Sequence, residues 1–289
     1  MSLIHRKITL TLDYVGQDVA KLSGARMSVN CAISGGAGLA TAQIRIFGLT
    51  LSRMNQFSTV GLLPTAFRQN IVTIEAGDDI SGMAKIFEGT IQDAWVDFQA
   101  APEVSFNISA LGGLSEALMN IPGSSFPGSV DAAVVLKGLA DQMGLTFENN
   151  GVSVMLSKPT YPGSALAQAR SCADAANINM VVDKGVLAIW PKSGFRAGSS
   201  ELVSGETGMI GYPSFTSTGI MVATRFNPRI EFGRLVQIQS TVQQGNSEHG
   251  VNGTWNVVTL VHDIESEVPA GKWMTHLQLA APGYTVVAQ

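Results

Sequence analysis

The spacing of apolar residues changes twice along the chain, and this change limits the fold more than any other feature of the sequence. Up to residue 113, and again from residue 202, apolar and polar residues alternate, as in Ile8–Val15 and Ala42–Leu49. Between these regions apolar residues recur at helical spacing, as in Ser129–Gly144. A period of two indicates half-buried strands, and the longer period indicates amphipathic helices. The sequence therefore predicts a mainly β protein with an α+β insert.

This pattern divides the 289 residues into three predicted domains. Residues 1–113 and 202–289 are predicted to form two small antiparallel β-barrel domains, because glycine-rich turns separate several short strands. Residues 114–201 are predicted to form a compact helix-hairpin domain that the two barrels flank. Segments rich in Gly, Pro and Ser, namely Asn120–Ser129 and Lys192–Ser200, lie near the limits of this insert.

Two helices and two hairpins are expected inside the insert. The helices are predicted over Ser129–Gly144, with Ser129 as the candidate N-cap, and over Ser164–Ala176. The hairpins are predicted to turn at Asn150-Gly151 and at Asp183–Gly185, since such dipeptides favour tight turns between strands.

The last part of the chain repeats an order of strands that ends the first region: a strand, a long strand, a turn and a further strand. Seventeen positions separate Ile91 from Ile108, and the same number separates Leu260 from Leu277. Sequence identity between the two segments is low. They are therefore either two related barrels in one chain or unrelated hairpins of similar length. Gly89, inside the first long strand, is expected to form a bulge or a corner.

The composition indicates a protein that works within an assembly. Charged residues make up 14% of the chain, whereas soluble domains average roughly 25%, and the mean hydropathy is +0.22. Other subunits are therefore expected to cover much of the surface. The net charge of −4 argues against binding nucleic acid through its phosphates. We expect no membrane-spanning segment, no signal peptide and two reduced cysteines, and hence folding in a cytoplasm.

The sequence offers no catalytic, cofactor-binding or metal-binding site. His262 and His276 would face each other across a hairpin that turns near Pro269, but two ligands do not make a metal site. A glycosidase needs two carboxylates placed on either side of a sugar bond. Four acidic residues cluster in the first region and are interpreted as solvated: Glu88, Asp93, Asp97 and Glu103.

A rigid corner with two arginines joins two predicted strands near residue 227. Pro228 fixes φ and lacks an N–H, so a strand must end or turn there, and Asn227 suits the start of a turn. Arg225 and Arg229 could reach carboxylates or carbonyls of a neighbouring subunit. The candidate subunit interface therefore comprises Arg225, Phe226, Asn227, Pro228 and Arg229. The alternative is an ordinary surface turn with solvated arginines.

The same corner carries a resemblance to a known family. Gly219–Ser240, followed by Gly253–Ser266 and Trp273–Leu279, resembles the C-terminal domain of baseplate hub proteins of contractile-tailed bacteriophages. The segment Gly185–Gly194 also resembles the middle domain of that family. The positions that carry the main resemblance are Phe226, Pro228, Gly233, Val236, Ile238, Trp255, Val261 and His262.

The resemblance implies two barrels of the tail-tube type in each chain and a homotrimer that joins the sixfold tail tube to the threefold spike. Three chains would present six barrels around a channel for genome ejection, through which DNA would pass without specific binding. The implied partners are the tail tube protein, the spike protein and other baseplate proteins. The implied location is the virion, after assembly in the host cytoplasm. No cofactor is implied.

Two other functions remain open on the sequence alone. One is a tail-associated cell-wall hydrolase, which would need converging polar groups in a pocket. The other is a carbohydrate- or receptor-binding adhesion module, which would need exposed aromatic side chains.

Overall fold

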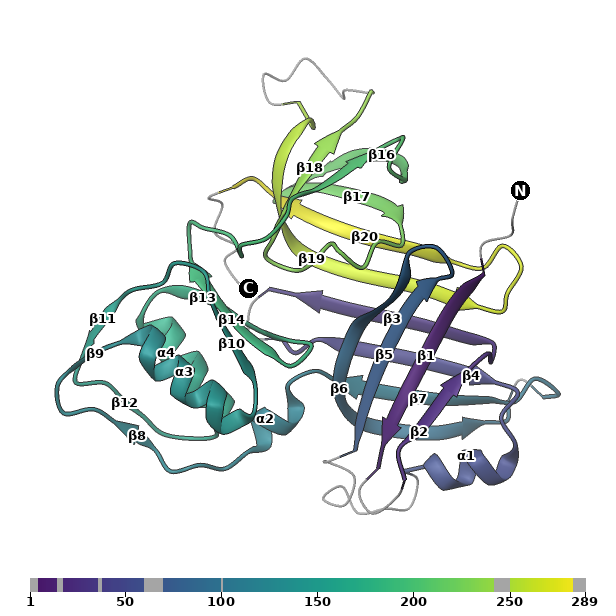
Figure 1. The fold of residues 1–289 in the computed structure, drawn as a ribbon, viewed down its shortest axis with the longest axis horizontal. Coiled ribbons are helices and arrows are strands. Elements are labelled where there is room, and N and C mark those ends of the chain that lie inside the picture. Colours follow the sequence, from purple (N-terminus) through teal and green to yellow (C-terminus); the bar gives the residue numbers. More distant parts are fainter. Residues whose placement is uncertain are drawn as a thin grey trace.

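The computed structural model describes residues 5–14, 18–35, 38–59, 70–99, 101–241 and 250–282. In these residues the chain is mainly β, as predicted, and it contains twenty strands and four helices. Figure 1 shows two lobes of strands, one above the other, and a third region with two longer helices beside them. We call these parts the first lobe, the second lobe and the middle region.

The first lobe is built from the alternating segments at the start of the chain. Its strands are β1 (Arg6–Asp13), β2 (Ala20–Ser23), β3 (Met27–Ser34), β4 (Thr41–Phe47), β5 (Ile71–Asp78), β6 (Gly82–Asp97) and β7 (Ser105–Leu111). Helix α1 (Leu51–Phe57) lies between β4 and β5 in sequence, and Thr50 caps its start.

The second lobe contains the alternating segments at the end of the chain. Its strands are β15 (Glu201–Ser204), β16 (Met209–Thr216), β17 (Gly219–Arg225), β18 (Leu235–Gln239), β19 (Gly253–Ser266) and β20 (Trp273–Ala280). All but one of its strand pairs are antiparallel, and the exception is the parallel pair of β15 and β18.

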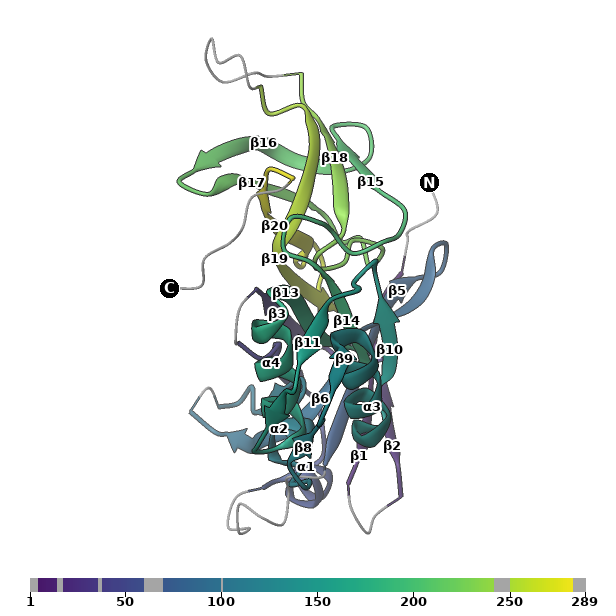
Figure 2. The same cartoon turned by 90° about the vertical axis from the view of Figure 1, so that its left-hand side faces the viewer.

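The middle region has a core of its own. Its elements are α2 (Leu114–Leu118), β8 (Ser124–Ser125), β9 (Ser129–Asp131), α3 (Ala132–Met143), β10 (Thr146–Asn149), β11 (Met155–Ser157), β12 (Thr160–Tyr161), α4 (Ala165–Ala175), β13 (Ile178–Asp183) and β14 (Val186–Pro191). Leu136 and Leu139 of α3 pack with Leu166 of α4 in a cluster of buried residues separate from that of the lobes. Figure 2 shows α3 and α4 on the face of the molecule that this region covers.

One sheet of thirteen strands runs through both lobes. Along it the strands follow the order β16-β17-β20-β19-β3-β4-β7-β6-β5-β1-β2, with β18 and β15 attached to β19. The lobes meet where β3 pairs antiparallel with β19 over eight residue pairs, from Ser34 opposite Thr259 to Met27 opposite Ser266.

The expectation of two separate closed barrels is wrong for the part of the chain that the structure describes, where no sheet closes on itself. The reason is the pairing of β3 with β19. Along one edge, β3 and β19 each form backbone hydrogen bonds with a strand of the other lobe. These edges are therefore paired between the lobes and not within each lobe. The domain limits at 113/114 and 201/202 stay a prediction.

The repeated order of strands extends beyond the hairpins that suggested it. The first lobe has the order β3-β4-β7-β6-β5-β1, and the second has β16-β17-β20-β19-β18-β15, with each set in the same succession along the chain. The residue match was wrong, however. Leu260 pairs with Leu277, whereas Ile108 pairs with Ala94 and not with Ile91.

Both lobes bend their long strand at a comparable place. The register shifts after Ile91 in β6 and after Val257 in β19. The N–H of Ile91 donates to the carbonyl of Asn70, just before β5, and the N–H of Val257 donates to that of Arg234, just before β18. Gly89 lies where β6 changes its partner from β5 to β7. A Cβ at Gly89 would be only 2.6 Å from the carbonyl oxygen of Leu111, so the predicted corner depends on a residue without a side chain.

The local predictions for the middle region hold with two exceptions, the N-cap of α3 and one of the hairpins. Helix α3 ends at Gly144 in the left-handed conformation, but its cap is Asp131, whose Oδ1 accepts from the N–H of Ala133 (2.8 Å), and not Ser129. The hairpin of β13 and β14 turns at Lys184-Gly185, where both φ angles are positive (52° and 84°).

The second exception is the hairpin at Asn150-Gly151. Strand β10 pairs in parallel with β14, and β11 pairs with β9, so β10 and β11 are not partners. The side chain of Asn149 bonds the N–H (2.8 Å) and the carbonyl (3.0 Å) of Val152. The chain therefore makes a loop held by a side chain, and the two strands leave it toward different partners.

Candidate assembly interface

Phe226 anchors the predicted corner to the second lobe. Its N–H donates to the carbonyl of Trp273 (3.0 Å). Its ring meets those of Trp273 and His262 edge to face, with centroids 5.0 and 5.2 Å apart. Such pairs stabilise a packed arrangement beyond the area that they bury. Phe226 therefore holds the corner in place from inside the lobe.

Asn227 forms the turn, as its residue type predicted. Its Oδ1 accepts from the N–H of Arg229 (3.0 Å), and its own N–H donates to Oγ1 of Thr275 (3.2 Å). Its Nδ2 reaches Oε2 of Glu201 in β15 (3.4 Å). The side chain thus fixes the backbone around Pro228 and ties the corner to two strands of the lobe.

Arg225 and Arg229 are both exposed. Within the described residues neither guanidinium forms an ion pair or a hydrogen bond. The structure thus keeps the two arginines near one rigid corner with their donors directed to solvent. Their role in an interface stays a prediction.

A cluster of charged residues, which the sequence did not reveal, lies close to the corner. It comprises Glu148, Lys184 and Arg196 of the middle region and Glu231 and Arg234 of the second lobe. Arg196 holds Glu148 through two hydrogen bonds of 2.8 and 2.7 Å, and one of its nitrogens lies 3.5 Å from Glu231. Lys184 and Arg234 approach Glu231 to 3.1 and 3.0 Å.

The charge cluster is largely removed from solvent, since only 4% of the Arg196 side chain is exposed. The hydrogen bonds from Arg196 lower the pKa of Glu148 below its ordinary value. Burial raises the pKa of the neighbouring Asp183, although Lys184 opposes this shift. Arg196 lies in Lys192–Ser200, which the sequence placed near the limit of the insert. Its burial shows that this segment is fixed between the middle region and the second lobe.

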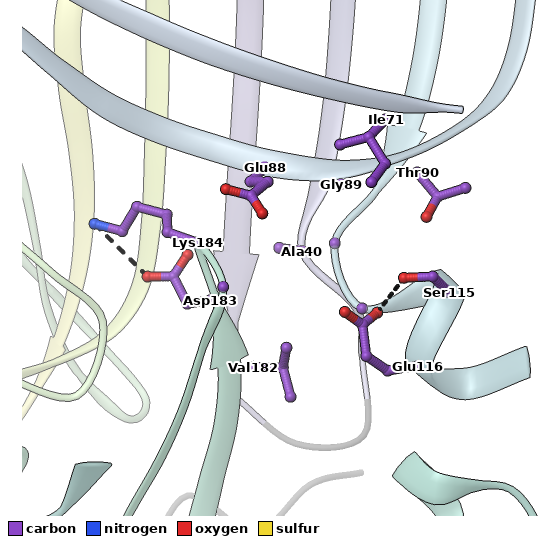
Figure 3. Close-up of a pocket in the computed structure, with 13 residues that line it drawn as sticks. Ala40, Ile71, Glu88, Gly89, Thr90, Ser115, Glu116, Val182, Asp183 and Lys184 are labelled. Atoms are coloured by element: carbon purple, nitrogen blue, oxygen red, sulfur yellow. Dashed lines mark hydrogen bonds and ion pairs between the residues drawn. The ribbon is translucent and has the colours of Figure 1, made fainter. Parts of the chain in front are cut away.

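A small pocket lies between the first lobe and the middle region. Figure 3 shows Glu88 of β6, Glu116 of α2 and Asp183 of β13 around it. Its volume is about 40 Å³, which admits about one or two water molecules but no sugar ring. Glu88 is paired with Lys85 (2.6 Å), and the Lys184 amine lies 3.8 Å from Asp183.

A larger cavity of about 530 Å³ separates the middle region from the strands that join the lobes. This volume suits a small ligand. Its lining is mainly apolar, and among the described residues Asp174 is the one carboxylate in it. Of the acidic residues that were considered for glycosidase chemistry, Glu103 pairs with Arg26 (3.2 Å) and Asp93 is exposed on β6. The described residues thus place no pair of carboxylates in a cavity large enough for a sugar ring.

The expected pairing of His262 with His276 is wrong. His262 lies opposite Thr275, and His276 lies opposite Val261, so the two imidazoles point to opposite faces of the sheet. His262 is buried, its Nδ1 lies 2.9 Å from Oγ1 of Thr275, and burial lowers its pKa to about 3. His249 lies outside the described residues. Among those described, no three His, Cys, Asp or Glu side chains group as metal ligands.

The comparison with protein families shows which family the chain belongs to. Residues 7–269 match the family described as "Baseplate hub gp41". The protein belongs to the baseplate hub gp41 family. This is a family of structural phage tail proteins, so the chain is a component of the phage baseplate and of the virion. The resemblance found in the sequence is therefore confirmed.

Solved structures show the same fold at very low sequence identity. A tail protein from Neisseria meningitidis MC58 is 8% identical, with a TM-score of 0.62, and the alignment covers 96% of this chain and 98% of that one. The 43 kDa tail protein of prophage MuSo2 from Shewanella oneidensis is 11% identical, with a TM-score of 0.61 and the same coverage. A comparison with curated proteins gave no match.

A third similar structure comes from a secretion system. The E. coli c3393 protein, a component of the type VI secretion system, is 7% identical, with a TM-score of 0.58, over 96% of this chain and 79% of that one. At these identities the likeness shows the fold alone.

One motif position of this baseplate hub chain has a clear structural reason. Gly233 has a positive φ of 79°, and a Cβ there would lie 2.8 Å from the indole ring of Trp190 in the middle region. Its carbonyl accepts from the N–H of Arg196 (2.8 Å). Gly233 thus lets the strand connection of the second lobe contact the middle region closely.

In the described residues no helix is long and apolar enough to cross a membrane.

Proposed function

We propose that this chain is the structural hub subunit that joins the sixfold tail tube to the threefold spike. The observation that carries the proposal is the repeated strand order in one chain, β3-β4-β7-β6-β5-β1 and β16-β17-β20-β19-β18-β15. Two lobes with the same order of strands allow a homotrimer to present six similar units to the tube and three identical chains to the spike, although β1 pairs antiparallel with β5 and β15 pairs in parallel with β18. Two tube-like domains with limits at 113/114 and 201/202 are part of this proposal.

Similar structures support the spike as a partner. The E. coli c3393 protein is described as structurally similar to the T4 phage tail proteins gp27 and gp5. A Francisella PdpA–VgrG complex is similar to 99% of this chain, with 8% identity and a TM-score of 0.54, although the match covers 59% of that longer chain. We propose a tail tube protein, a spike protein and other baseplate proteins as partners of this chain.

The proposed channel carries the genome during ejection. The net charge of −4 favours passage over binding, because a protein with few cations on its surface gains little from displacing counterions on DNA. The proposed role is mechanical, with no catalytic activity, and assembly takes place in the host cytoplasm before the particle is complete.

The test is the mass of the purified full-length protein, measured by native mass spectrometry with the spike protein present and absent. The proposal predicts a species of three chains of 30.4 kDa each. A monomer under all conditions, or a closed assembly whose number of chains is not three, would contradict it.

A further inference from the structure

We propose that the free edge of β13, which lines the cavity of about 530 Å³ between the middle region and the strands that join the lobes, binds an extended segment of another baseplate protein as an added strand. The segment is an apolar peptide with one acidic side chain. This inference rests on the proposed function in one respect, because it gives a docking site to one of the other baseplate proteins named there as partners.

Strand β13 lies at the edge of the three-stranded sheet of the middle region. Within the described residues the order of that sheet is β10-β14-β13, so β13 has β14 as its one neighbour. Figure 1 shows β13 and β14 extending from the middle region toward the strands that join the lobes. No backbone hydrogen bond in the described residues reaches the other edge of β13. An open edge of this kind is a site where a further strand can pair.

The turn of the β13–β14 hairpin fixes which backbone groups of β13 face the free edge. The two-residue turn at Lys184-Gly185 makes the flanking Asp183 and Val186 a hydrogen-bonded pair. Along an antiparallel ladder such pairs alternate with pairs that are not hydrogen-bonded. Pro191, which has no N–H to donate, lies opposite Ile178, in agreement with this alternation. The N–H and carbonyl groups that point away from β14 are therefore those of Ile178, Met180 and Val182.

The cavity runs along this free edge. All five residues from 178 to 182 in β13 line it. Successive side chains of a strand point to opposite faces of the sheet, so a cavity that touches five in succession lies beside the strand and not over one face. Five residues of strand span about 17 Å. The cavity therefore suits an extended segment of about five residues.

The lining of the cavity indicates the chemistry of its occupant. Most of its side chains are apolar, as are Met180 and Val258. Two lining residues carry buried polar atoms without a hydrogen-bond partner in the described part of the chain, the indole N–H of Trp190 and Oδ1 of Asn256. Buried polar groups are nearly always hydrogen-bonded. A peptide group offers both the carbonyl and the N–H that these two atoms lack.

Two cations in the lining favour a segment with an acidic side chain. Arg170 of α4 and Lys192 both line the cavity, and neither forms an ion pair within the described residues. Asp174 is the one carboxylate among the lining residues described, so cations outnumber carboxylates there. Lys192 follows Pro191, the partner of Ile178. The acidic side chain therefore belongs near the Ile178 end of the added strand.

A segment of a partner chain satisfies the free edge, whereas a small apolar ligand would leave its backbone groups unpaired. Peptides that add to the edge of a sheet gain affinity from main-chain hydrogen bonds and specificity from pockets for alternate side chains. Every strand in the described residues already pairs with another strand of this chain. The added strand is therefore assigned to a different protein.

Hydrogen exchange resolved to single residues tests the docking edge on the isolated full-length protein and on purified baseplates. In the isolated protein we expect the amides of Met180 and Val182 to exchange at least about tenfold faster than that of Val181, which is bonded to β14. In the baseplate we expect the exchange of Met180 and Val182 to be slowed by at least about a hundredfold. The amide of Val181, as the internal control, should change little.

Each other result has a defined meaning. Slow exchange of Met180 in the isolated protein would show that this chain or a copy of it covers the edge, and would overturn the partner. Fast exchange of Met180 in the baseplate would overturn the docking edge, and a trimer in native mass spectrometry would then leave the proposed function standing. Protection of Met180 in the baseplate, for a chain that assembles in a number other than three, would contradict the proposed function and support the docking edge.

Two variants at one position separate strand addition from mere covering of the edge. Met180→Pro removes an N–H of the free edge but no hydrogen bond to β14, and Met180→Ala, the matched control, keeps that N–H. Both must first melt at the same temperature. In baseplates we expect the amide of Val182 to exchange at least about tenfold faster in the proline variant than in the alanine variant. Equal protection in the two variants would overturn strand addition.

A second pair of variants tests the acidic side chain and does not depend on the folding of the proline variant. Lys192→Glu reverses a charge in the cavity, and Lys137→Glu reverses one on the exposed side of α3 as the control. Only Lys192→Glu should speed the exchange of Val182 in baseplates. Equal rates in the two variants would overturn the charge complementarity of the proposed segment.

Discussion

The two lobes share one order of strands but differ in the connection that follows the third of the six matched strands along the chain. In the first lobe the connection from β4 to β5 contains α1 and Thr59, and Thr59 bonds the edge of β6 at Ala94. In the second lobe the connection from β17 to β18 is the short corner that Phe226 anchors, and the edge of β19 is left for β3. The equivalent edges of β6 and β19 thus have different partners: Thr59 bonds the edge of β6, and β3 pairs with the edge of β19.

This difference shows how one scaffold can serve two kinds of contact. A strand edge that a local segment closes is protected from association, and an edge that stays open is available for pairing. The second lobe offers its edge within the chain, and β3 takes it over eight residue pairs. The middle region adds a further asymmetry, because the charge cluster ties it to Glu231 and Arg234 of the second lobe.

Removing Arg196 tests that asymmetry and should have the largest effect. The change Arg196→Ala would leave Glu148 and Glu231, which are 29% and 20% exposed, without their shared guanidinium. Breaking a buried ion pair from one side typically costs about 3–5 kcal/mol, so we expect the free energy of unfolding to fall by about 3 kcal/mol. Chemical denaturation measures it. Arg229→Ala on the exposed corner is the control and should change stability by less than about 0.5 kcal/mol. Equal effects would show that the cluster does not hold the middle region.

The two lobes also differ at one titratable position. His262 of β19 and Val96 of β6 occupy equivalent positions, because each lies the same number of residues after the register shift of its strand. Burial lowers the pKa of His262 from 6.5 to about 3. The unfolded chain therefore binds more protons between these values, so stability is complete above pH 6.5 and falls as the pH decreases. Between pH 6.5 and 4.5 this residue should cost about 2 kcal/mol.

The variant His262→Val, which copies the first lobe, isolates this effect. Denaturation of both proteins at the two pH values gives the difference, in which the contribution of Asp183 is common to both. Lys184, which also lowers the pKa of His262, is unchanged in the variant. If the variant loses as much stability on acidification as the parent, His262 is not the source of the dependence.

The arginines of the corner should have the smallest effect on folding. Arg225→Ala and Arg229→Ala remove exposed side chains that have no ion-pair partner in the described residues, so each should change stability by less than about 0.5 kcal/mol. Loss of a charge that is buried in an interface costs about 2–5 kcal/mol of binding. Sedimentation of the variants with and without partner proteins would detect such a loss. Assembly equal to that of the parent would leave the corner as a plain surface turn.

The sequence predicted what depends on neighbouring residues. The alternating segments became strands, Gly144 ended α3, and Lys184-Gly185 made the tight turn between β13 and β14. Each of these outcomes follows from the conformational preference of a few adjacent residues. The family resemblance also rested on local sequence, chiefly in Gly219–Ser240, Gly253–Ser266 and Trp273–Leu279.

The failed predictions concern partners that are distant in sequence. Nothing near β3 indicates that it pairs with β19, more than 200 residues later, and this pairing replaced two closed barrels with one sheet. The register of His262 and His276 was wrong by one residue, which in a strand reverses the face of the sheet. Arg196 gave no sign of burial, because its partners Glu148 and Glu231 lie in different regions of the chain.

The most direct test of the central claim is a cryo-electron microscopy map of the purified hub, or of the baseplate, viewed along the symmetry axis. The account predicts three chains whose first and second lobes alternate around one channel, giving six similar units of density with the middle regions outside them. A ring in which only one lobe of each chain faces the channel, or an assembly without threefold symmetry, would contradict it.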